Sequence, residues 1–342
     1  MSDWAFKMLP GDPYKTGAAD WLDKAIGWAG GLGMYVMVDL HGAPGSQNGF
    51  DNSGQKTTTP SFTSQANIDL TLEVLGMLNT KYSTNPTVAG IAILNEPFPQ
   101  KMGDKQQQLQ KVEQFHKAGV AKVSGTAAIV SDAFEQPSYW DDKFSASGQQ
   151  GNQPGGPTTA KTNSSSAVII DHHDYQVFDD DLLRKSTAVS ILSRTTSSPY
   201  SPGLPRIPTT SPNLPLTLSP QEHTTHATSL SFPSTHPIII GEFSGAMTDC
   251  AKYLNGRTEG ARWESKYSLS KGLNKICPPA VNDLELFRND KTLVEETRKF
   301  VNAQVKSFGE TSGWFFWNFR TEGAGEWDAL FLNGLGGFFK GT

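Results

Sequence analysis

The chain has 342 residues, a length that suits one large domain or two ordinary ones. Hydrophobic residues make up 37% of it, which is enough to form a core. The net charge of −5 and the pI near 5.8 argue against a nucleic-acid partner and against a basic membrane-binding patch. We expect no membrane span and no signal peptide in this chain, because neither an apolar run of spanning length nor a charged and then apolar N-terminus is present.

Helices and strands are predicted to alternate from the start. A helix is expected over residues 17–33, where three glycines end the pattern. Its apolar face would consist of Trp21, Leu22, Ala25, Ile26, Trp28 and Ala29. A strand over 35–41 follows and runs into a loop rich in Gly, Pro and Asn at 42–52. Ser64 is a suitable N-cap for the next helix, in which leucines recur at helical spacing.

The next predicted strand, 89–97, ends abruptly in polar residues. Its apolar run reads as a strand buried on both faces, and it stops at Asn95, Glu96 and Pro97. A carboxylate at the tip of such a strand lies where parallel α/β enzymes place their chemistry. A solvated Glu at an ordinary strand end is the alternative interpretation of this stretch alone.

The remaining pattern continues the alternation with two interruptions. Helices are expected at 104–123 and 291–308, and strands at 127–132, 167–173 and 313–318. The segment 145–166 reads as a surface loop, and Ser219 as the start of another helix. Residues 186–218 are rich in Ser, Thr and Pro and predict a disordered insert. The Gly- and Phe-rich end, 334–342, resembles no packed element.

A second strand repeats the ending of the first. Residues 236–243 form a β-branched run followed by Gly241 and a lone carboxylate, Glu242. A hydrolase with two carboxyl groups needs one that is protonated, to donate to a leaving oxygen, and one that is ionised. Only a fold that gathers its strand ends could bring Glu96 and Glu242 together.

Six strands that alternate with helices predict a parallel sheet with helices outside it. A closed (β/α) barrel fits the length, and an open doubly wound sheet is the alternative. The open sheet loses support because no G-x-G-x-x-G follows an early strand, and no P-loop is present. Cys250 and Cys277 could form one disulfide or remain two thiols, and the sequence leaves both open.

The chain resembles the fungal exo-β-1,3-glucanases of glycoside hydrolase family 5. The resemblance covers most of residues 3–328 apart from the insert at 186–218. It rests on a run of motifs in the family's order, namely Asp39–Gly54, Leu94–Pro97, Tyr175–Phe178, Gly241–Ser244, Thr248–Gly256 and Gly313–Trp317.

The resemblance implies a single domain over 1–342 with the α/β fold of a (β/α)8 barrel. It implies a retaining hydrolase that releases glucose from β-1,3-glucan chain ends without a cofactor or metal. Glu96 would be the acid/base and Glu242 the nucleophile. The residues expected to bind sugar are His41, Phe50, Asp51, Asn52, Asn95, His173, Tyr175, Phe178 and Trp317. We expect Tyr175 or a neighbour to bond the nucleophile, and Trp314 to belong to the core.

The resemblance also implies an extracellular or cell-wall location and a monomer acting on β-glucan. The chain departs from the family in several places. It starts at what resembles the end of the family's second strand, so that strand 1 and most of strand 2, with an arginine used near the nucleophile, are absent. Asp174 stands where the family has a His, and Phe243 replaces a Trp. Our hypothesis is a wrongly assigned first exon and, at 186–218, a retained intron.

Two other classes of function compete with the hydrolase. One is a metal site, whose ligands would come from His41, Glu96, His172, His173, Asp174 and Glu242. It is disfavoured because the strand at 35–41 lacks an H-x-H pair. The other is a catalytically incompetent remnant or glucan-binding protein, which the missing strands favour.

Overall fold

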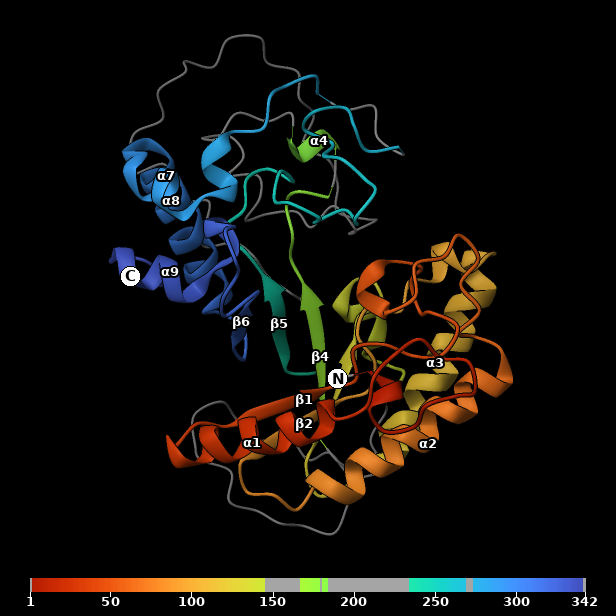
Figure 1. Cartoon of the computed structure of the whole chain (residues 1–342). Coiled ribbons are helices and arrows are strands. Elements are labelled where there is room, and N and C mark those ends of the chain that lie inside the picture. Colours follow the sequence, from red (N-terminus) through yellow and green to blue (C-terminus); the bar gives the residue numbers. More distant parts are fainter. Residues whose placement is uncertain (1, 145–166, 179, 184–233, 269–272, 341–342) are drawn as a thin grey trace. The chain divides into compact units, whose positions relative to one another are not determined.

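A computed structural model describes residues 2–144, 167–178, 180–183, 234–268 and 273–340 (Figure 1). The chain divides into two compact units, of which the first comprises Met1–Asp171 with Ser234–Pro237. The second comprises His172–Pro233 and Ile238–Thr342. The predicted loop at 145–166, the insert at 186–218 and the helix expected from Ser219 lie outside the described residues.

All the predicted strands are present. They are β1 (Val36–Asp39), β2 (Val88–Ala92), β3 (Ala127–Ser131), β4 (Val168–His173), β5 (Ile238–Phe243) and β6 (Trp314–Phe316). Hydrogen bonds join them in the order β1-β2-β3-β4-β5-β6. The registered pairs are parallel, with Val38 opposite Ile91 and Ile91 opposite Ala128. The parallel sheet predicted from the alternating pattern is therefore confirmed.

The strand that leads to Glu96 is shorter than predicted. β2 ends at Ala92. Between Ala92 and Glu96 the chain makes one hydrogen bond to β3 and one to the residue that follows β1. The N–H of Ile93 donates to Ile129 O at 2.9 Å, and the N–H of Asn95 donates to Leu40 O at 2.9 Å. The segment therefore stays anchored after regular pairing stops, because apolar residues 93 and 94 are fully buried.

The helices of the first unit are α1 (Ala18–Gly31), α2 (Gln65–Tyr82) and α3 (Lys105–Lys122). Ser64 caps α2 as predicted, with its Oγ accepting from the N–H of Asn67 at 3.4 Å. Asp104 caps α3, and its Oδ1 accepts from the N–H of Gln107 at 2.9 Å. Leu75 and Leu78 of α2 are buried, so the leucines that recur at helical spacing lie on its inward face, and Val112 and Phe115 of α3 are buried as well.

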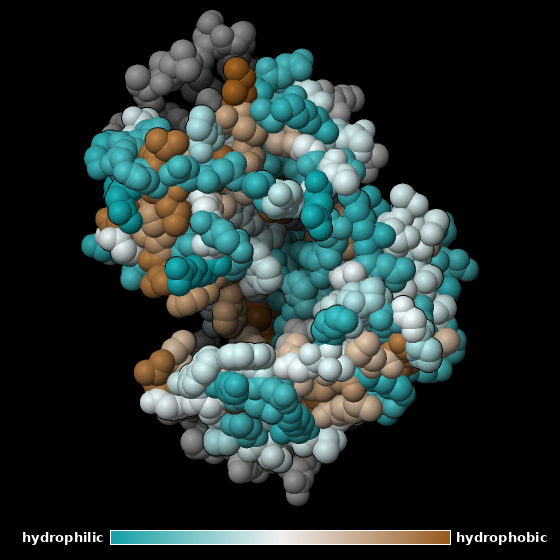
Figure 2. All heavy atoms as spheres, viewed as in Figure 1, coloured by the Kyte–Doolittle hydropathy of each residue, from teal (hydrophilic) through white to brown (hydrophobic). Residues whose placement is uncertain are grey.

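The apolar face predicted for α1 is mostly not buried. Only Ile26 of its apolar residues is buried, whereas Trp21 is 62% and Trp28 61% exposed. Leu32 and Met34, in the connection to β1, are also exposed, and Figure 2 shows apolar side chains at the surface there. β1 is an edge strand of the sheet, so α1 has less of the sheet to cover than α2 or α3.

The second unit is built around a core of β5, β6 and the C-terminal helices. Within its described residues, the helices are α4 (Asp180–Leu183), α7 (Leu284–Asn289), α8 (Lys291–Phe308) and α9 (Ala329–Leu335). The bounds predicted for α8 match. The expectation of an unpacked end is wrong, because α9 reaches Leu335 and Phe338 joins the core cluster. Gly336 and Gly337 have φ of 76° and 79°, which lets the chain turn back so that Phe338 is buried.

Short 3-10 helices complete the described structure: η1 (Asp3–Ala5), η2 (Asp51–Ser53), η3 (Pro99–Lys101), η4 (Pro137–Trp140), η6 (Pro279–Asn282) and η7 (Gly325–Trp327). Cys250 and Cys277 form a disulfide, which settles the question that the sequence left open. Next to it, the buried carboxylate of Asp249 accepts from the N–H groups of Arg262 and Trp263 at 2.6 and 3.0 Å. No helix among the described residues is long and apolar enough to cross a membrane.

Candidate active site

In the first unit, His41 stands two residues after the end of β1. Its Nδ1 lies 2.7 Å from Oδ2 of Asp39. The two residues are two positions apart at the end of a strand, so their side chains point to the same face. Asp39 was not among the predicted site residues, although this alternation is readable in the sequence. The carboxylate fixes the orientation of the imidazole ring.

Gln47 ties the loop after β1 to the end of the β2 segment. Its fully buried side chain donates through Nε2 to His41 O and to Asn95 O, each at 2.9 Å. Its Oε1 accepts from the N–H of Ala43 at 3.2 Å. No pattern in the sequence distinguishes Gln47, because an amide within a polar loop looks like a solvated residue. These bonds hold the backbones of two predicted site residues in place.

Glu96 is buried, with 9% of its surface exposed. Its Oε2 accepts a hydrogen bond from Nδ2 of Asn52 at 2.9 Å. Its φ of 43° lies in the left-handed region, which costs a non-glycine residue on the order of 1 kcal/mol and is concentrated at functional sites. The turn from β2 is therefore strained at the residue that carries the carboxylate.

Asn95 presents an unused donor. Its Nδ2 is buried and has no hydrogen-bond partner among the described residues. A buried donor without a partner costs about 1–3 kcal/mol, so such a group calls for an explanation, and a polar ligand is one. The predicted role of Asn95 in holding a sugar hydroxyl is consistent with this position.

Aromatic rings line the strand ends of the first unit. Phe50 lies with its ring centroid 6.0 Å from Phe98, which lies 4.7 Å from Phe134. The Nζ of Lys101 lies 5.3 Å from the Phe50 ring centroid. Phe50 was predicted to bind sugar, whereas Phe98 and Phe134 were not singled out. Asp51, which begins η2, is exposed.

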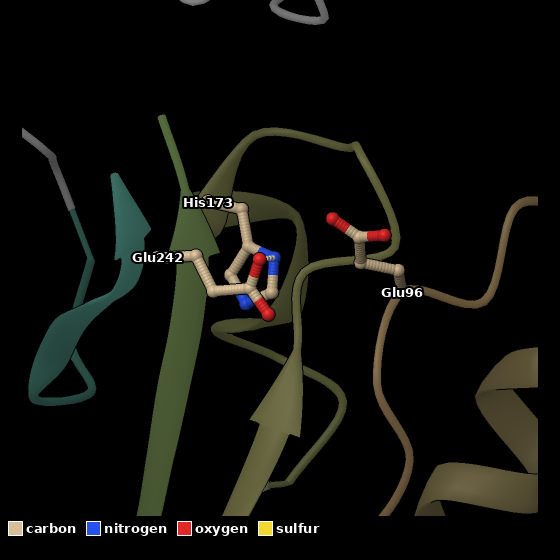
Figure 3. Close-up of side chains that lie close together, drawn as sticks. All are labelled: Glu96, His173 and Glu242. Carbon is tan, nitrogen blue, oxygen red and sulfur yellow. Dashed lines mark ion pairs between the residues drawn. The ribbon is translucent and has the colours of Figure 1, made fainter. Parts of the chain in front are cut away.

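In the second unit, Glu242 lies near the end of β5. Its carboxylate is close to two side chains from the end of β4 and the residues just after it, His173 and Tyr175. The hydroxyl of Tyr175 donates to Glu242 Oε2 at 2.8 Å. Nδ1 of His173 lies 3.6 Å from the same oxygen. Figure 3 shows the imidazole of His173 beside the carboxylate of Glu242, and it also draws Glu96 on its loop. The backbone bond from Asp174 N–H to Glu242 O, at 2.9 Å, keeps the two strand ends level.

Asp174 lies between His173 and Tyr175 in sequence, and its side chain is buried. Burial raises the pKa of this carboxyl from its usual value to about 6, while the nearby His172 and a hydrogen bond from Gln176 oppose the rise. A hydrogen bond from Nε2 of Gln176 reaches Oδ1 of Asp174. Asp174 is therefore held inside the protein among neutral and weakly basic partners.

Phe178 and Tyr175 form an aromatic group with Trp327. The ring centroids of Tyr175 lie 5.5 Å from those of Phe178 and of Trp327. The guanidinium of Arg262 lies 5.7 Å from the Phe178 ring. Trp327 was missed, because a Trp in a Gly- and Glu-rich stretch carries no pattern that distinguishes a site from a core.

Trp314, which begins β6, and Trp317, which follows its last residue, have different surroundings. Trp314 packs against the core and makes an edge contact with Phe243 at 5.6 Å, as expected of a core residue. Trp317, predicted to stack on a sugar, is 39% exposed, and its backbone N–H donates to the backbone oxygen of Phe243 at 2.7 Å. A partly exposed indole fixed by its backbone is suited to stacking on a ligand.

Each unit thus carries one carboxylate next to a donor at the end of a strand. Hydrogen bonds donated to a carboxylate favour its ionised form, and this chemistry suits a nucleophile or a base. Within the described second unit, His173 and Glu242 are two potential metal ligands, with Nδ1 and Oε2 lying 3.6 Å apart. Zinc sites use three or four protein ligands, so this pair does not by itself make one.

Comparison with known families gives a match over most of the chain. Residues 5–274 match the model of the family described as Cellulase (glycosyl hydrolase family 5). A glucan 1,3-beta-glucosidase of Candida oleophila is 34% identical over 345 residues, covering 97% of this chain and 68% of that protein. The glucan 1,3-beta-glucosidase I/II of Saccharomyces cerevisiae is 32% identical, covering 97% of this chain and 65% of its own length. The chain therefore spans about two thirds of the length of these relatives.

Solved structures agree on the fold. The rutinosidase from Aspergillus niger superimposes with a TM-score of 0.55 at 14% identity, covering 99% of this chain and 77% of that chain. A second crystal structure, of AoRut, gives a TM-score of 0.58 at 14% identity and covers 98% and 76%. The predicted fold class, a (β/α)8 barrel that is incomplete, is confirmed: the described residues supply six of the strands.

Proposed function

The chain belongs to glycosyl hydrolase family 5, and from this membership we propose that it releases glucose from the chain ends of β-1,3-glucan with retention of configuration. The chain is a glycosidase by its family. The finer assignment is supported by relatives named glucan 1,3-beta-glucosidase. The observation that carries the proposal is the carboxylate of Glu242, held at the end of β5 by the Tyr175 hydroxyl.

In the proposed reaction, Glu242 is the nucleophile. Its ionised carboxylate attacks the anomeric carbon and forms a glycosyl–enzyme ester, while the bond to the leaving oxygen breaks. Glu96 gives its proton to that oxygen, so that the shortened glucan leaves as an alcohol. Water then attacks the anomeric carbon, Glu96 takes a proton from it, and Glu242 is released. This mechanism requires the two carboxyl groups to lie about 5 Å apart during the reaction.

The remaining predicted residues would bind the sugar. Asn95, with its unused donor, would hold a hydroxyl of the terminal glucose, and Trp317 would stack on its ring. Phe50 and Phe178 would flank the next sugar, with Asp51 and Asn52 on the same side as Phe50. His41 and His173 would line the pocket. Each of these assignments is part of the proposal.

The proposal extends to where the protein works. A β-glucan of the cell wall is a polymer outside the cell, so we propose an extracellular or cell-wall location. We also propose that the protein acts as a monomer, because every residue given a role in the reaction lies within one chain.

The test is hydrolysis of laminarin by the purified full chain. Release of glucose is expected, with loss of at least about 1000-fold in kcat for Glu242→Gln and Glu96→Gln on laminarin, since each would remove a reacting group. Glu310→Gln, at an exposed position on the surface, is the matched control and should retain full activity. Normal turnover in either active-site variant would refute the assignment.

A second candidate function is a glucan-binding protein without activity. The observation that favours it is the sheet of six strands in the described residues, where a closed barrel of this class has eight. Binding of laminarin measured by calorimetry, together with no release of glucose by the native chain, would favour this candidate over the hydrolase. Hydrolysis by the native chain would exclude it.

A further inference from the structure

Asn52 donates directly to the carboxylate that the proposed reaction uses twice. We propose that Asn52 is a positioning residue for Glu96, and that it sets the pH at which this carboxyl group loses its proton. The inference rests on the proposed function, in which Glu96 is the acid/base. It assigns to Asn52 a role that is separate from binding sugar.

The contact is the last in a relay of amides. The backbone N–H of Phe50 donates to Oδ1 of Asn48 at 2.9 Å. Nδ2 of Asn48 donates to Oδ1 of Asn52 at 3.1 Å. Nδ2 of Asn52 then donates to Oε2 of Glu96 at 2.9 Å. Every step runs in one direction, from a backbone group of the loop to the carboxylate of Glu96.

The direction of the relay is determined at its start. A backbone N–H can only donate, so Asn48 must turn its oxygen toward Phe50 and its NH₂ group toward Asn52. Asn52 must then offer its oxygen to Asn48, which leaves its NH₂ group for Glu96. The amide of Asn52 is thus oriented before any substrate arrives, and it presents a donor to the carboxylate.

The surroundings make this donor effective. Asn48 is fully buried and Glu96 nearly so, whereas Asn52, which lies between them, is exposed. Hydrogen bonds to charged groups are stronger where water is excluded, so it is the burial of the Glu96 carboxylate that strengthens this contact. The loop is also braced from inside, since the buried hydroxyl oxygens of Ser46 and Ser53 lie 2.6 Å apart. Because Ser53 follows Asn52 directly, this bond limits the movement of the residue that contacts Glu96.

A fixed donor has two consequences for an acid/base. It holds the carboxyl group in one orientation, and it favours the ionised form, which the second half of the proposed reaction requires. Removing the donor should make Glu96 keep its proton to higher pH. The basic limb of the pH profile of kcat/KM, where a general acid is lost by ionisation, should then move to higher pH.

Asn52→Asp is the sharpest variant. Aspartate keeps an acceptor for Asn48 but replaces the donor toward Glu96 by a negative oxygen. We expect the basic limb of kcat/KM on an aryl β-glucoside to move up by about one pH unit or more, because a like charge adds to the lost hydrogen bond. Asn52→Ala should move the limb in the same direction by a smaller amount.

Asn48→Asp tests the relay without touching the residue that contacts Glu96. Aspartate at 48 still accepts from Phe50 but cannot donate to Asn52. The amide of Asn52 should then turn its NH₂ group toward position 48, which removes the donor from Glu96. The basic limb should again move to higher pH. An unchanged limb in this variant, with a shift in Asn52→Asp, would contradict the relay.

The control is Gln55→Glu, which makes the same amide-to-acid change at an exposed position three residues along the loop. It should leave the basic limb in place. A raised KM with an unmoved limb in Asn52→Asp would overturn the inference and leave Asn52 as a binding residue only. Glu96→Gln separates the two proposals: if this variant keeps its activity, the proposed function fails, whereas loss of activity there with an unmoved limb in Asn52→Asp refutes the inference alone.

Discussion

At the scale of single residues, the contact between Tyr175 and Glu242 can be tested directly. The 2.8 Å hydrogen bond from the phenol stabilises the ionised carboxylate. Tyr175→Phe removes the donor and keeps the ring that packs on Phe178 and Trp327. Since a hydrogen bond to a charged group contributes about 1.5–3 kcal/mol, kcat/KM should fall roughly 10- to 150-fold.

The measurement is steady-state hydrolysis of an aryl β-glucoside by the Tyr175→Phe variant. Trp327→Phe, which alters the same aromatic group without removing a hydrogen bond to the carboxylate, is the control and should lose less activity. Equal losses in the two variants would mean that Tyr175 acts through packing alone.

A buried histidine that is not among the predicted site residues makes stability depend on pH. His116 of α3 is fully buried, and neither of its ring nitrogens has a hydrogen-bond partner in the described part of the chain. Its ring lies 4.9 Å from Trp140. Burial lowers the pKa of His116 from its usual 6.5 to about 3. The folded chain therefore keeps this side chain neutral where the unfolded chain protonates it.

This difference between the two states makes the protein less stable as the pH falls. Above pH 6.5 the imidazole of His116 is neutral in both the folded and the unfolded chain, so it does not change the free energy of unfolding with pH. As pH falls from 6.5 toward 3, the unfolded state binds a proton that the folded state does not, so the free energy of unfolding decreases by up to about 1.4 kcal/mol per pH unit. The variant His116→Phe should lose this component, so urea unfolding at pH 7 and pH 4.5 should show a smaller drop in stability than in the native chain. An identical drop would contradict the role of His116.

At the scale of elements, α1 shows where the sequence could mislead. Its apolar residues recur at helical spacing, and the helix is present, yet Trp21 and Trp28 lie on the surface. Periodicity identifies a helix with an apolar face, but what covers that face depends on the neighbouring strand. We expect Ile26→Ala to cost about 2–5 kcal/mol, as in a core, and Trp28→Gln to change stability by less than about 0.5 kcal/mol.

Chemical unfolding of the two variants decides between these packings. If Trp28→Gln lowers the free energy of unfolding as much as Ile26→Ala, the indole of Trp28 is covered in solution, which would contradict its exposed position on α1. The control is the dependence of the free energy of unfolding on denaturant concentration. If this slope is similar in both variants, the difference in stability does not come from the unfolded state.

Other elements could be predicted because local and tertiary signals agreed. α8 begins where Asp290 caps it and ends near Gly309, and its buried residues follow the helical period, so its bounds could be read from the chain. The strands that end near Glu96 and Glu242 were visible as apolar runs cut off by polar residues. The burial of Phe338 was not visible, since it depends on a turn through two glycines and on a core built by distant segments.

The site could be predicted in part for the same reason. Glu96, Glu242 and Tyr175 stand at strand ends within recognisable motifs. Gln47 and Asn48 act through hydrogen bonds to backbone groups, and such contacts leave no pattern of spacing or hydrophobicity in a polar loop. Trp327 enters its aromatic group from a stretch more than 140 residues from Tyr175 in sequence (327 − 175 = 152), and only the folded chain shows that contact.

At the scale of the whole molecule, the six parallel strands and the family membership support the function proposed above, in which the carboxylates of Glu96 and Glu242 would act on one glycosidic bond. The chain spans about two thirds of the length of its relatives, so the activity must be measured on the full chain itself. In the proposed reaction, the covalent bond to the sugar forms at the carboxylate of Glu242.

The most direct measurement is therefore covalent trapping. A 2-deoxy-2-fluoro-β-glucosyl fluoride forms the glycosyl–enzyme ester but hydrolyses slowly, because the fluorine destabilises the charged transition state. Incubation with the full chain, followed by proteolysis and mass spectrometry, should find the fluoroglucosyl group on the peptide that contains Glu242, and Glu242→Gln should remove it. Labelling of another residue, or no labelling while the native chain hydrolyses laminarin, would contradict the account.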